Sequence, residues 1–313
     1  MVLEKKNLLS IKDLKKEEIQ YVLELAESFR EVSTRDIKKI PTLRGRTIVN
    51  LFIEPSTRTR TSFELAAKRL SADVVNISAK GSSLVKGESL KDTAKTIEAL
   101  GADAVIIRHS SAGAAIFFAE NVKCKVINAG DGAHEHPTQA LLDLYTIKEK
   151  LGRINDLNVG IIGDIAHSRV ARSNISVLNK MGAKVTLIAP PTLIPVKIEA
   201  MGAEVAYDFD RVIGKFDVIY MLRIQTERQN ESLFPSIREY AKLFGLNLER
   251  LKKAKKDVLI MHPGPMNRGI EISSEVADIP QTVAAEQVTN GLGIRMAVLY
   301  LLLGGGAVGE VAV

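Results

Sequence analysis

Short apolar runs alternate with helix-like stretches along most of this chain, and this alternation restricts the folds that it can adopt. The runs have the length and the valine and isoleucine content of buried strands, and they lie at residues 47–53, 73–77, 104–107, 125–128, 158–162, 184–188, 218–221 and 258–261. Strands that alternate with helices form a parallel sheet with helices on both of its faces. We therefore predict an α/β fold of two doubly wound domains, each a mainly parallel sheet flanked by helices.

Helical patterns at the start, middle and end of the chain indicate how these two domains are delimited. Residues 11–31 carry apolar side chains at helical spacing, so an amphipathic helix opens the chain. A long helical pattern at 138–151 joins the two halves, and the pattern at 284–303 has no strand after it. We predict long interdomain helices and these domain limits: 1–150 completed by 284–313 for the first domain, and 151–283 for the second. The 313 residues, 46% of them hydrophobic, are enough for two cores.

Cysteine content, apolar runs and charge exclude several classes of protein. A single cysteine, Cys124, excludes an internal disulfide and is typical of a reducing compartment. The N-terminus lacks the apolar core of a signal peptide, and the longest apolar run near the C-terminus, residues 296–303, is too short to cross a bilayer. The net charge of +6 permits anionic ligands, but the sequence has neither zinc-finger spacing nor an RNA-binding aromatic motif. We predict a cytoplasmic protein that binds neither nucleic acid nor membranes.

Residues 55–63 read Pro-Ser-Thr-Arg-Thr-Arg-Thr-Ser-Phe and follow the first apolar run, where a helix is expected to begin. Hydroxyl side chains favour the first positions of a helix, and the free N–H groups there suit an anion. Arginine adds planar, charge-assisted donors that match phosphate oxygens. A well-capped helix with solvated Arg58 and Arg60 is the alternative, but capping alone needs only one hydroxyl. The stretch therefore predicts a phosphate site.

A second polar cluster, at residues 134–139, reads His-Glu-His-Pro-Thr-Gln and follows a glycine-containing segment. Pro137 suits the first turn of the helix that follows. A metal site is one interpretation because two histidines flank a glutamate, but a catalytic zinc usually needs three protein ligands and no third is evident nearby. A purely structural loop is another. The interpretation that we favour is that His136 and Gln139 offer an imidazole and an amide to a polar substrate.

A strand runs into a glycine turn at residues 160–169, which read Gly-Ile-Ile-Gly-Asp-Ile-Ala-His-Ser-Arg. The pattern is similar to a dinucleotide-binding fingerprint, but the third glycine is missing. The next strand also ends at Ala-Pro-Pro, residues 189–191, where a nucleotide site would have an acidic residue. We instead predict that Arg169 is exposed at the turn and binds a carboxylate.

Two further turns follow predicted strands in the second half. Arg223 and Gln225 come just after residues 218–221, and the alternation of side chains in an extended segment points both the same way. Residues 262–265 read His-Pro-Gly-Pro, a stiff turn in which we expect a cis peptide bond before Pro265. The backbone carbonyls of this turn can accept hydrogen bonds from a substrate amide, although a purely structural turn is the alternative.

Three motifs in this order, at residues 56–60, 136–139 and 262–265, resemble the aspartate/ornithine carbamoyltransferase family, and the resemblance extends from the first helix to about Ala297. It implies a carbamoyl phosphate site in the first domain. The phosphate would be held by Ser56, Thr57, Arg58, Thr59 and Arg108. The carbamoyl oxygen would be polarised by Thr59, Arg108 and His136. The carbamoyl amide would be held by Gln139 and the carbonyls of Gly264 and Pro265. The catalytic set would be His136, Thr59, Arg108 and Arg58.

The resemblance also implies an assembly. Residues 82–88 resemble a loop that reaches the active site of a neighbouring subunit, so that Ser82 and Lys86 would act in trans within a homotrimer. A plain surface loop is the alternative interpretation. The resemblance leaves room for regulatory chains or a partner enzyme of the same pathway.

The acceptor can be argued from the residues themselves. Aspartate has two carboxylates, and the expected binding residues are Arg169, Arg223, Gln225, Lys86 and Ser82. Ornithine would need an acidic or polar pocket for its second amine. Related ornithine enzymes carry a cysteine in the turn equivalent to 262–265 and a Ser-Met-Gly-like stretch in place of 221–223, and this chain has neither. Both differences favour aspartate.

We therefore expect direct attack of the aspartate α-amine on carbamoyl phosphate, as in pyrimidine biosynthesis, without metal or cofactor. The products would be N-carbamoyl-L-aspartate and phosphate. The alternatives are a carbamoyltransferase for another amine such as ornithine, a non-catalytic protein that binds phosphorylated metabolites, and a dinucleotide-dependent oxidoreductase.

Overall fold

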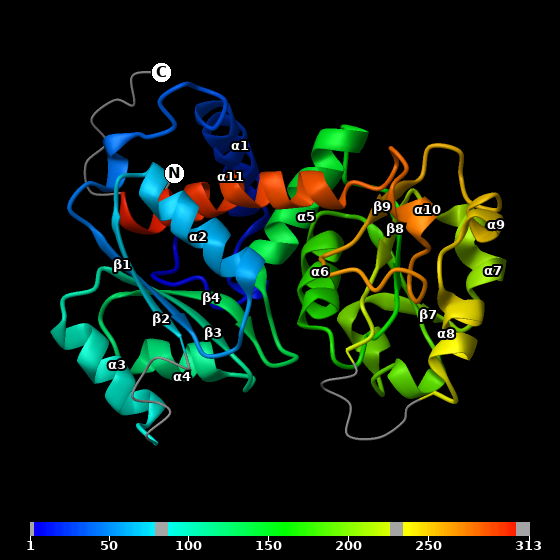
Figure 1. The fold of residues 1–313 in the computed structure, drawn as a ribbon, viewed down its shortest axis with the longest axis horizontal. Coiled ribbons are helices and arrows are strands. Elements are labelled where there is room, and N and C mark those ends of the chain that lie inside the picture. Colours follow the sequence, from blue (N-terminus) through cyan, green and yellow to red (C-terminus); the bar gives the residue numbers. More distant parts are fainter. Residues whose placement is uncertain (1–2, 79–86, 226–233, 305–313) are drawn as a thin grey trace. The chain divides into compact units, whose positions relative to one another are not determined.

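The computed structural model describes residues 3–78, 87–225 and 234–304 and divides into two compact units (Figure 1). Unit 1 consists of the described residues within Met1–Leu142 and Val288–Val313, and unit 2 consists of those within Asp143–Gln287. The borders between the units fall inside two long helices, α5 (Pro137–Leu151) and α11 (Ala284–Leu303). Each unit contains its own parallel sheet, as the alternation of strands and helices predicts.

The sheet of unit 1 has four parallel strands in the order β2-β1-β3-β4. Their bounds are β1 (Thr47–Phe52), β2 (Asp73–Ser78), β3 (Ala104–His109) and β4 (Lys125–Asp131). The segment that precedes the first helix lies along the outer edge of β4, where the Leu8 N–H donates to the Val126 carbonyl at 3.0 Å and the Asn128 N–H donates to the Leu8 carbonyl at 2.9 Å. This segment therefore covers an edge that would otherwise expose unpaired backbone groups.

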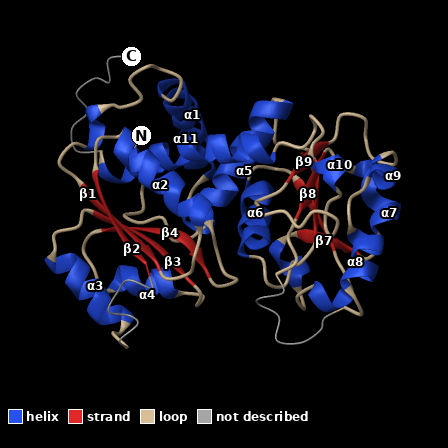
Figure 2. Cartoon of the chain, viewed as in Figure 1, coloured by secondary structure: helices blue, strands red, loops and turns tan. Residues whose placement is uncertain are grey.

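Helices cover both faces of the unit 1 sheet (Figures 1 and 2). They are α1 (Lys16–Val32), α2 (Thr57–Arg69), α3 (Leu90–Ala99) and α4 (Ala114–Glu120), together with parts of α5 and α11. Alternate strand residues such as Val49, Val105 and Ile107 pack in one buried cluster with Ile97 of α3 and Phe118 of α4. In β1 and β3 the alternation of side chains leaves the neighbouring residues, such as Ile48 and Ile106, for the opposite face, where they are also buried. The residues of the edge strand β2 are exposed or half-buried.

The sheet of unit 2 has five parallel strands in the order β7-β6-β5-β8-β9. Their bounds are β5 (Asn158–Ile162), β6 (Lys184–Ile188), β7 (Ala203–Ala206), β8 (Val218–Met221) and β9 (Leu259–Met261). The remaining helices are α6 (Arg169–Lys180), α7 (Phe209–Val212), α8 (Ile237–Phe244), α9 (Leu248–Leu251) and α10 (Ser274–Ala277). The central strands β5 and β8 are buried almost throughout, which explains their continuous apolar sequences.

The predicted fold class is confirmed, and a strand lies at each of the apolar runs from which it was inferred. The prediction missed β7 and α4. Strand β7 has only four residues, Ala-Glu-Val-Ala, at the edge of its sheet, and alanine and glutamate are not typical of strands. Helix α4 has seven residues and starts after Gly113, which has φ +81° and offers no side chain to cap the helix.

A buried arginine of α9 connects this helix to α7 and α8 in unit 2. The guanidinium of Arg250 makes two hydrogen bonds to the Asp210 carboxylate, at 2.9 and 3.2 Å, and a further one to the Lys242 carbonyl at 3.0 Å. It also lies over the ring of Phe209, 5.3 Å from the centroid. The hydrogen bonds from Arg250, together with Lys253, lower the pKa of Asp210 to about 2.

This lowered pKa predicts an acid-sensitive contribution to stability. A carboxylate whose pKa is lower in the folded than in the unfolded state stabilises the fold above its unfolded pKa, and this stabilisation disappears as the pH falls from about 4 to about 2. Because the Asp210 side chain is 41% exposed, we expect Asp210→Asn to lower the free energy of unfolding by only about 1 kcal/mol at pH 7.

Urea unfolding of wild type and Asp210→Asn at neutral pH and near pH 2 would measure this difference. We expect it to shrink towards zero at the lower pH. Glu199→Gln, which alters an exposed carboxylate of the same unit, is the matched control. A difference between wild type and Asp210→Asn that stayed the same at both pH values would contradict the assignment.

Candidate active site

The hydroxyl-rich motif begins helix α2 directly after β1, as predicted. Ser56 has an extended backbone and is the N-cap residue, and its Oγ accepts a hydrogen bond from the Thr59 N–H at 3.4 Å. Thr57 and Arg58 are exposed in the first turn, and Thr59 is buried behind them. A helix of 13 residues has the positive end of its dipole here, so this turn suits an anion such as phosphate.

Arg108 spans the ends of three neighbouring strands in unit 1. It lies near the end of β3, its Nη2 donates to Glu54 Oε1 at 2.8 Å, and its Nη1 donates to the Ala129 carbonyl at 3.1 Å. The Ile53 N–H after β1 donates to the Arg108 carbonyl at 2.9 Å. Arg108 therefore lies at the same sheet edge as the turn at Ser56. The sequence analysis missed Glu54, although an acidic residue between the strand and the hydroxyl motif was a readable signal.

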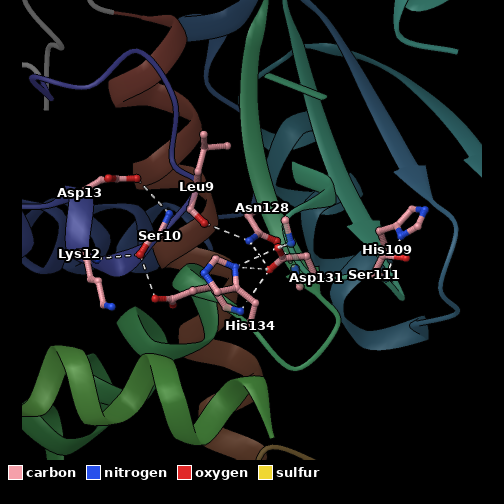
Figure 3. Close-up of polar contacts among 12 residues, drawn as sticks. Leu9, Ser10, Lys12, Asp13, His109, Ser111, Asn128, Asp131 and His134 are labelled. Atoms are coloured by element: carbon pink, nitrogen blue, oxygen red, sulfur yellow. Dashed lines mark hydrogen bonds and ion pairs between the residues drawn. The ribbon is translucent and has the colours of Figure 1, made fainter. Parts of the chain in front are cut away.

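A buried carboxylate organises the loop that leads to His136 (Figure 3). Asp131, at the end of β4, accepts hydrogen bonds from Asn128 Nδ2 at 2.7 Å, the Gly113 N–H at 2.7 Å and the Glu135 N–H at 3.1 Å. His134 Nδ1 lies 3.0 Å from the same carboxylate. Since a carboxylate only accepts, His134 donates through Nδ1. His134 thus has a structural partner.

The N-terminal segment holds the same loop from another side (Figure 3). Ser10 Oγ donates to Glu135 Oε1 at 2.9 Å, and Asn128 Nδ2 also donates to the Leu9 carbonyl at 3.0 Å. Glu135, like His134, is therefore part of the hydrogen-bonding that shapes the loop. These partners are more than a hundred residues apart in sequence, so the sequence analysis had no local signal for them.

His136, Thr138 and Gln139 lie at the start of helix α5 and are all buried. Pro137 is the first residue of this helix, as predicted, and the His136 carbonyl accepts the Gln139 N–H at 3.0 Å. The predicted donor-binding residues of unit 1 therefore lie after β1, near the end of β3 and after β4, which are adjacent strands. Ligands of doubly wound sheets bind beyond these carboxyl ends.

The histidine next to Arg108 is uncharged. Burial lowers the pKa of His109, and its Nδ1 accepts a hydrogen bond from the Ser111 N–H at 2.8 Å (Figure 3). The positive charge at the end of β3 is therefore that of Arg108.

In unit 2, the loop after β5 leads directly into helix α6, whose first residue is Arg169. Ser168 is the N-cap residue and accepts the Ala171 N–H at 3.1 Å. Gly163 has φ +133°, and a Cβ there would lie 2.6 Å from the Leu222 carbonyl oxygen, so the loops after β5 and β8 pack closely. The prediction that Arg169 is exposed was wrong: its exposed fraction is 4%, because it lies on the buried face of α6 together with Ser173 and Val177 at helical spacing.

Arg223 and Gln225 follow β8 in an extended segment with the predicted alternation. Leu222 and Ile224 are buried, while Arg223 and Gln225 are half-buried. The side-chain amide of Gln225 donates to the His167 carbonyl at 3.1 Å. The structure therefore brings Gln225 to the loop that ends at Arg169.

Asp164, which was not among the predicted site residues, bonds both Gln225 and the His167 loop. Its Oδ2 accepts the Gln225 N–H at 3.3 Å, and its Oδ1 lies 2.8 Å from His167 Nδ1. Its position directly after Gly163 at a strand end was a readable signal.

The turn after β9 contains a cis peptide bond between Gly264 and Pro265, as predicted. Gly264 has φ +63°, a conformation that favours glycine, and its N–H donates to His262 Nδ1 at 2.8 Å. Strand β9 is the neighbour of β8, and β8 is the neighbour of β5. Arg169, Arg223 and Gly264 thus follow three adjacent strands of the unit 2 sheet. Ser82 and Lys86 lie outside the described residues.

Within residues 3–78, 87–225 and 234–304, no three His, Cys, Asp or Glu side chains gather as they would around a metal ion. Among the helices of this same part of the chain, none combines the length and the apolar character that crossing a bilayer requires.

Comparison with known proteins places this arrangement in a family. Residues 6–149 match the profile described as "Aspartate/ornithine carbamoyltransferase, carbamoyl-P binding domain", and residues 155–302 match the "Asp/Orn binding domain" of the same family. The chain belongs to the aspartate/ornithine carbamoyltransferase family.

Individual members of the family are similar over nearly the full length. The aspartate carbamoyltransferase catalytic subunit of Syntrophus aciditrophicus is 61% identical over 301 residues, covering 96% of this chain and 98% of that protein. Aspartate transcarbamoylase from Trypanosoma cruzi, solved with carbamoyl phosphate and aspartate, matches with a TM-score of 0.87 at 31% identity, covering 96% of this chain and 98% of that one.

An ornithine enzyme of the family has nearly the same fold. Ornithine carbamoyltransferase from Pyrococcus furiosus matches with a TM-score of 0.86 at 31% identity, covering 98% of this chain and 99% of that one. Because the two TM-scores are nearly equal, the fold of the family does not by itself identify the acceptor.

Proposed function

We propose that this chain transfers the carbamoyl group of carbamoyl phosphate to the α-amine of L-aspartate, giving N-carbamoyl-L-aspartate and phosphate. The observation that carries the choice of acceptor is the position of Arg223 just after β8, with Gln225 two residues further on. Related ornithine enzymes carry a Ser-Met-Gly-like stretch in place of residues 221–223. A guanidinium is suited to a carboxylate and unsuited to the second amine of ornithine. The high identity to aspartate carbamoyltransferase catalytic subunits supports the same choice.

The residues of unit 1 are assigned to the donor. The phosphate is held by Ser56, Thr57, Arg58, Thr59 and Arg108. The carbamoyl oxygen is polarised by Thr59, Arg108 and His136. The carbamoyl amide is held by Gln139 and, from the turn after β9, by the carbonyls of Gly264 and Pro265. This assignment is supported by the helix start at Ser56 and by the position of Arg108 at the ends of adjacent strands.

The residues of unit 2 are assigned mainly to the acceptor. Arg169 and Arg223 bind the two carboxylates of aspartate, with Gln225 alongside. The short distance from Gln225 to the loop before Arg169 supports this grouping. We assign Ser82 and Lys86 to the acceptor as well, on the resemblance to the family alone.

The reaction needs no covalent enzyme intermediate. The lone pair of the uncharged α-amine forms a bond to the carbamoyl carbon, and a tetrahedral intermediate results. The bond between this carbon and the bridging oxygen then breaks, and phosphate leaves with the electron pair. The amine proton goes to the departing phosphate, with His136 as the alternative acceptor.

The available effects are large enough for this mechanism. Alignment of two bound reactants lowers a barrier by roughly 7–11 kcal/mol. Each well-placed donor to the developing oxyanion adds about 3–4 kcal/mol. At roughly 1.4 kcal/mol per factor of ten, these contributions give about eight orders of magnitude in rate.

Three broader parts of the proposal rest on the family resemblance and on composition. They are a homotrimer with shared active sites, a role in pyrimidine biosynthesis, and a cytoplasmic location, for which the single cysteine is the supporting observation. A sedimentation measurement on the purified chain would test the trimer.

Release of inorganic phosphate from carbamoyl phosphate tests the proposed function. We expect rapid release with aspartate and only background release with ornithine or with no amine. Release with ornithine alone would reassign the acceptor. Tight binding of carbamoyl phosphate without release in any mixture would favour a non-catalytic binding protein.

Asp131→Asn tests the loop that carries His136. An amide in place of the carboxylate turns its NH₂ group towards the backbone and side-chain donors that now bond Asp131. The loop therefore loses some of the hydrogen bonds that shape it. We expect kcat/KM to fall about 10- to 100-fold, measured by initial rates. Asp103→Asn is the matched control, because Asp103 accepts the Thr47 N–H at 2.8 Å at the opposite end of the same sheet. Equal loss of activity in both variants would contradict a specific role of Asp131.

A further inference from the structure

A continuous series of buried hydrogen bonds in unit 2 runs from helix α5 to the turn after β9. Asp143 of α5 accepts from the side-chain amide of Gln287 through Oδ1 at 2.7 Å. The amide oxygen of Gln287 in turn accepts the backbone N–H of His262 at 2.9 Å. All three residues are buried. The series therefore connects the backbone N–H of His262, where the turn begins, to the buried carboxylate of Asp143.

The ring of His262 continues this series into the turn. Its Nδ1 accepts the Gly264 N–H at 2.8 Å, so the proton of the neutral ring is on Nε2. Nε2 donates to Glu271 Oε1 at 3.1 Å, and the same oxygen accepts the Asn267 N–H at 2.5 Å. The side chains of His262 and Glu271 are both 0% exposed. A single carboxylate thus ties together the two ends of the turn, residues 262 and 267.

The carboxylates, which only accept, and the backbone N–H groups, which only donate, together fix the direction of each bond in the series. A carboxylate accepts and does not donate, so Asp143 turns the NH₂ group of Gln287 towards itself and the amide oxygen towards His262. Glu271 likewise requires the proton on Nε2 of His262, which leaves Nδ1 to accept from Gly264. The carbonyls of Gly264 and Pro265 lie in the chain between the two backbone N–H groups, of Gly264 and Asn267, that the series holds.

Further donors satisfy the charge of Asp143. Its Oδ2 accepts from Asn174 Nδ2 at 2.8 Å and from the Tyr220 hydroxyl at 2.7 Å. Burying a carboxylate is unfavourable unless hydrogen bonds compensate, and an apolar core would hold the elements together without that cost. The carboxylates of Asp143 and Glu271 lie at the two ends of one series, and this arrangement indicates that they orient the turn at residues 262–267.

We propose that Asp143 and Glu271 are positioning residues that determine donor specificity. They orient the Gly264–Pro265 turn so that its carbonyls accept from the carbamoyl NH₂ group, and so favour a donor with an amide over an acyl phosphate without one. This proposal rests on the proposed function, because it takes the assignment of these carbonyls from it. Acetyl phosphate is the suitable comparison, since it has the phosphate and the carbonyl oxygen of carbamoyl phosphate but a methyl group in place of NH₂.

The test compares the dissociation constants of carbamoyl phosphate and acetyl phosphate, measured by calorimetry on the full chain. Asp143→Asn keeps the shape of the side chain but introduces a donor where only acceptors fit. Glu271→Ala removes the oxygen that accepts from His262 and Asn267. We expect carbamoyl phosphate to bind about tenfold more weakly to either variant, as the loss of a hydrogen bond or two implies, with acetyl phosphate changed less than about twofold. Tyr220→Phe, which removes one donor to Asp143, should give a smaller shift in the same direction and is the variant to measure if the other two do not fold.

Asp217→Asn is the matched control for a loss of stability alone. Asp217 belongs to the same unit and accepts a backbone N–H, from Asn158 at 2.8 Å, and a side-chain donor, Lys255 Nζ at 2.6 Å, away from the turn. Its substitution should lower the melting temperature and leave the ratio of the two dissociation constants unchanged. Equal weakening of both ligands in the Asp143 and Glu271 variants, or no change in the ratio, would overturn the proposal.

The same measurements distinguish a failure of the positioning role from a failure of the proposed function. Selective weakening of carbamoyl phosphate supports the positioning role whether or not wild type forms carbamoyl-aspartate. Product formation by wild type with an unchanged ratio in the variants overturns only the positioning role. Failure of wild type to bind carbamoyl phosphate would overturn both.

Discussion

Arg58→Ala is expected to reduce kcat/KM by on the order of 100- to 1,000-fold, because it removes a charge-assisted donor from the phosphate site. Arg58 lies in the exposed first turn of α2, directly after the Ser56 N-cap. The backbone of this turn and the positive end of the helix dipole remain in the variant, so some affinity for phosphate is retained. Initial rates at varied carbamoyl phosphate concentration and a calorimetric titration of the same ligand would measure the loss.

Lys68→Ala is the matched control for Arg58→Ala. Lys68 is an exposed cation on the same helix, and its Nζ pairs with Glu64 Oε1 at 2.6 Å, away from the first turn. We expect its substitution to change kcat/KM by less than about twofold, since an exposed ion pair of this kind contributes little. An Arg58→Ala protein that bound carbamoyl phosphate as tightly as wild type would show that the motif is a capped helix without a phosphate site.

Arg223→Ala is expected to raise the KM for aspartate about 100-fold while leaving the affinity for carbamoyl phosphate nearly unchanged. On the proposed assignment, the variant removes the guanidinium that binds one substrate carboxylate, and losing one partner of such a pair costs roughly 2–5 kcal/mol. The side chain is half-buried after β8, so water replaces the lost partner only in part. Initial rates with each substrate varied in turn would separate the two effects.

Arg211→Ala provides the comparison for Arg223→Ala. Arg211 is an exposed arginine on α7 of the same unit, the helix that follows the edge strand β7, which is not a neighbour of β8. Its removal should leave both KM values unchanged. An Arg223→Ala protein with an unaltered aspartate KM would mean that the acceptor assignment of unit 2 is wrong.

The sequence predicted the fold well because its main signals are local. Runs such as 158–162, 184–188 and 218–221 are rich in apolar residues, and the corresponding strands have these bounds. Strand β7 was missed because Ala-Glu-Val-Ala has no such signal, and it forms at Ala203–Ala206 through pairing with β6. Strand pairing joins residues that are apart in the sequence, so the local sequence pattern does not reveal a short edge strand such as β7.

The candidate site was predictable where each residue follows a strand directly. Ser56, Arg223 and Gly264 all lie at strand ends, so parallel topology alone brings them to the carboxyl edge of their sheets. Arg169 shows the limit of this reasoning: its position at a strand-to-helix turn was predicted, but its burial depends on how the face of α6 that carries Arg169, Ser173 and Val177 packs in the folded unit.

The supporting carboxylates could not be predicted. Asp143 and Gln287 are 144 positions apart, and Ser10 and Glu135 are 125 apart. Nothing near Asp143 or Glu135 in sequence distinguishes a buried acceptor from a solvated acid. Their partners are brought to them only by tertiary packing, and this is where the structure adds most to the motifs.

The most direct test of carbamoyl transfer to aspartate is the identity of the product formed from ¹³C-labelled carbamoyl phosphate in a mixture of equal aspartate and ornithine. Carbon NMR distinguishes the two carbamoylated amino acids in a single sample. Our account predicts labelled N-carbamoyl-L-aspartate as the dominant product, with label in carbamoyl-ornithine no greater than in an enzyme-free control. Label predominantly in carbamoyl-ornithine, or only the enzyme-free background in both products, would contradict it.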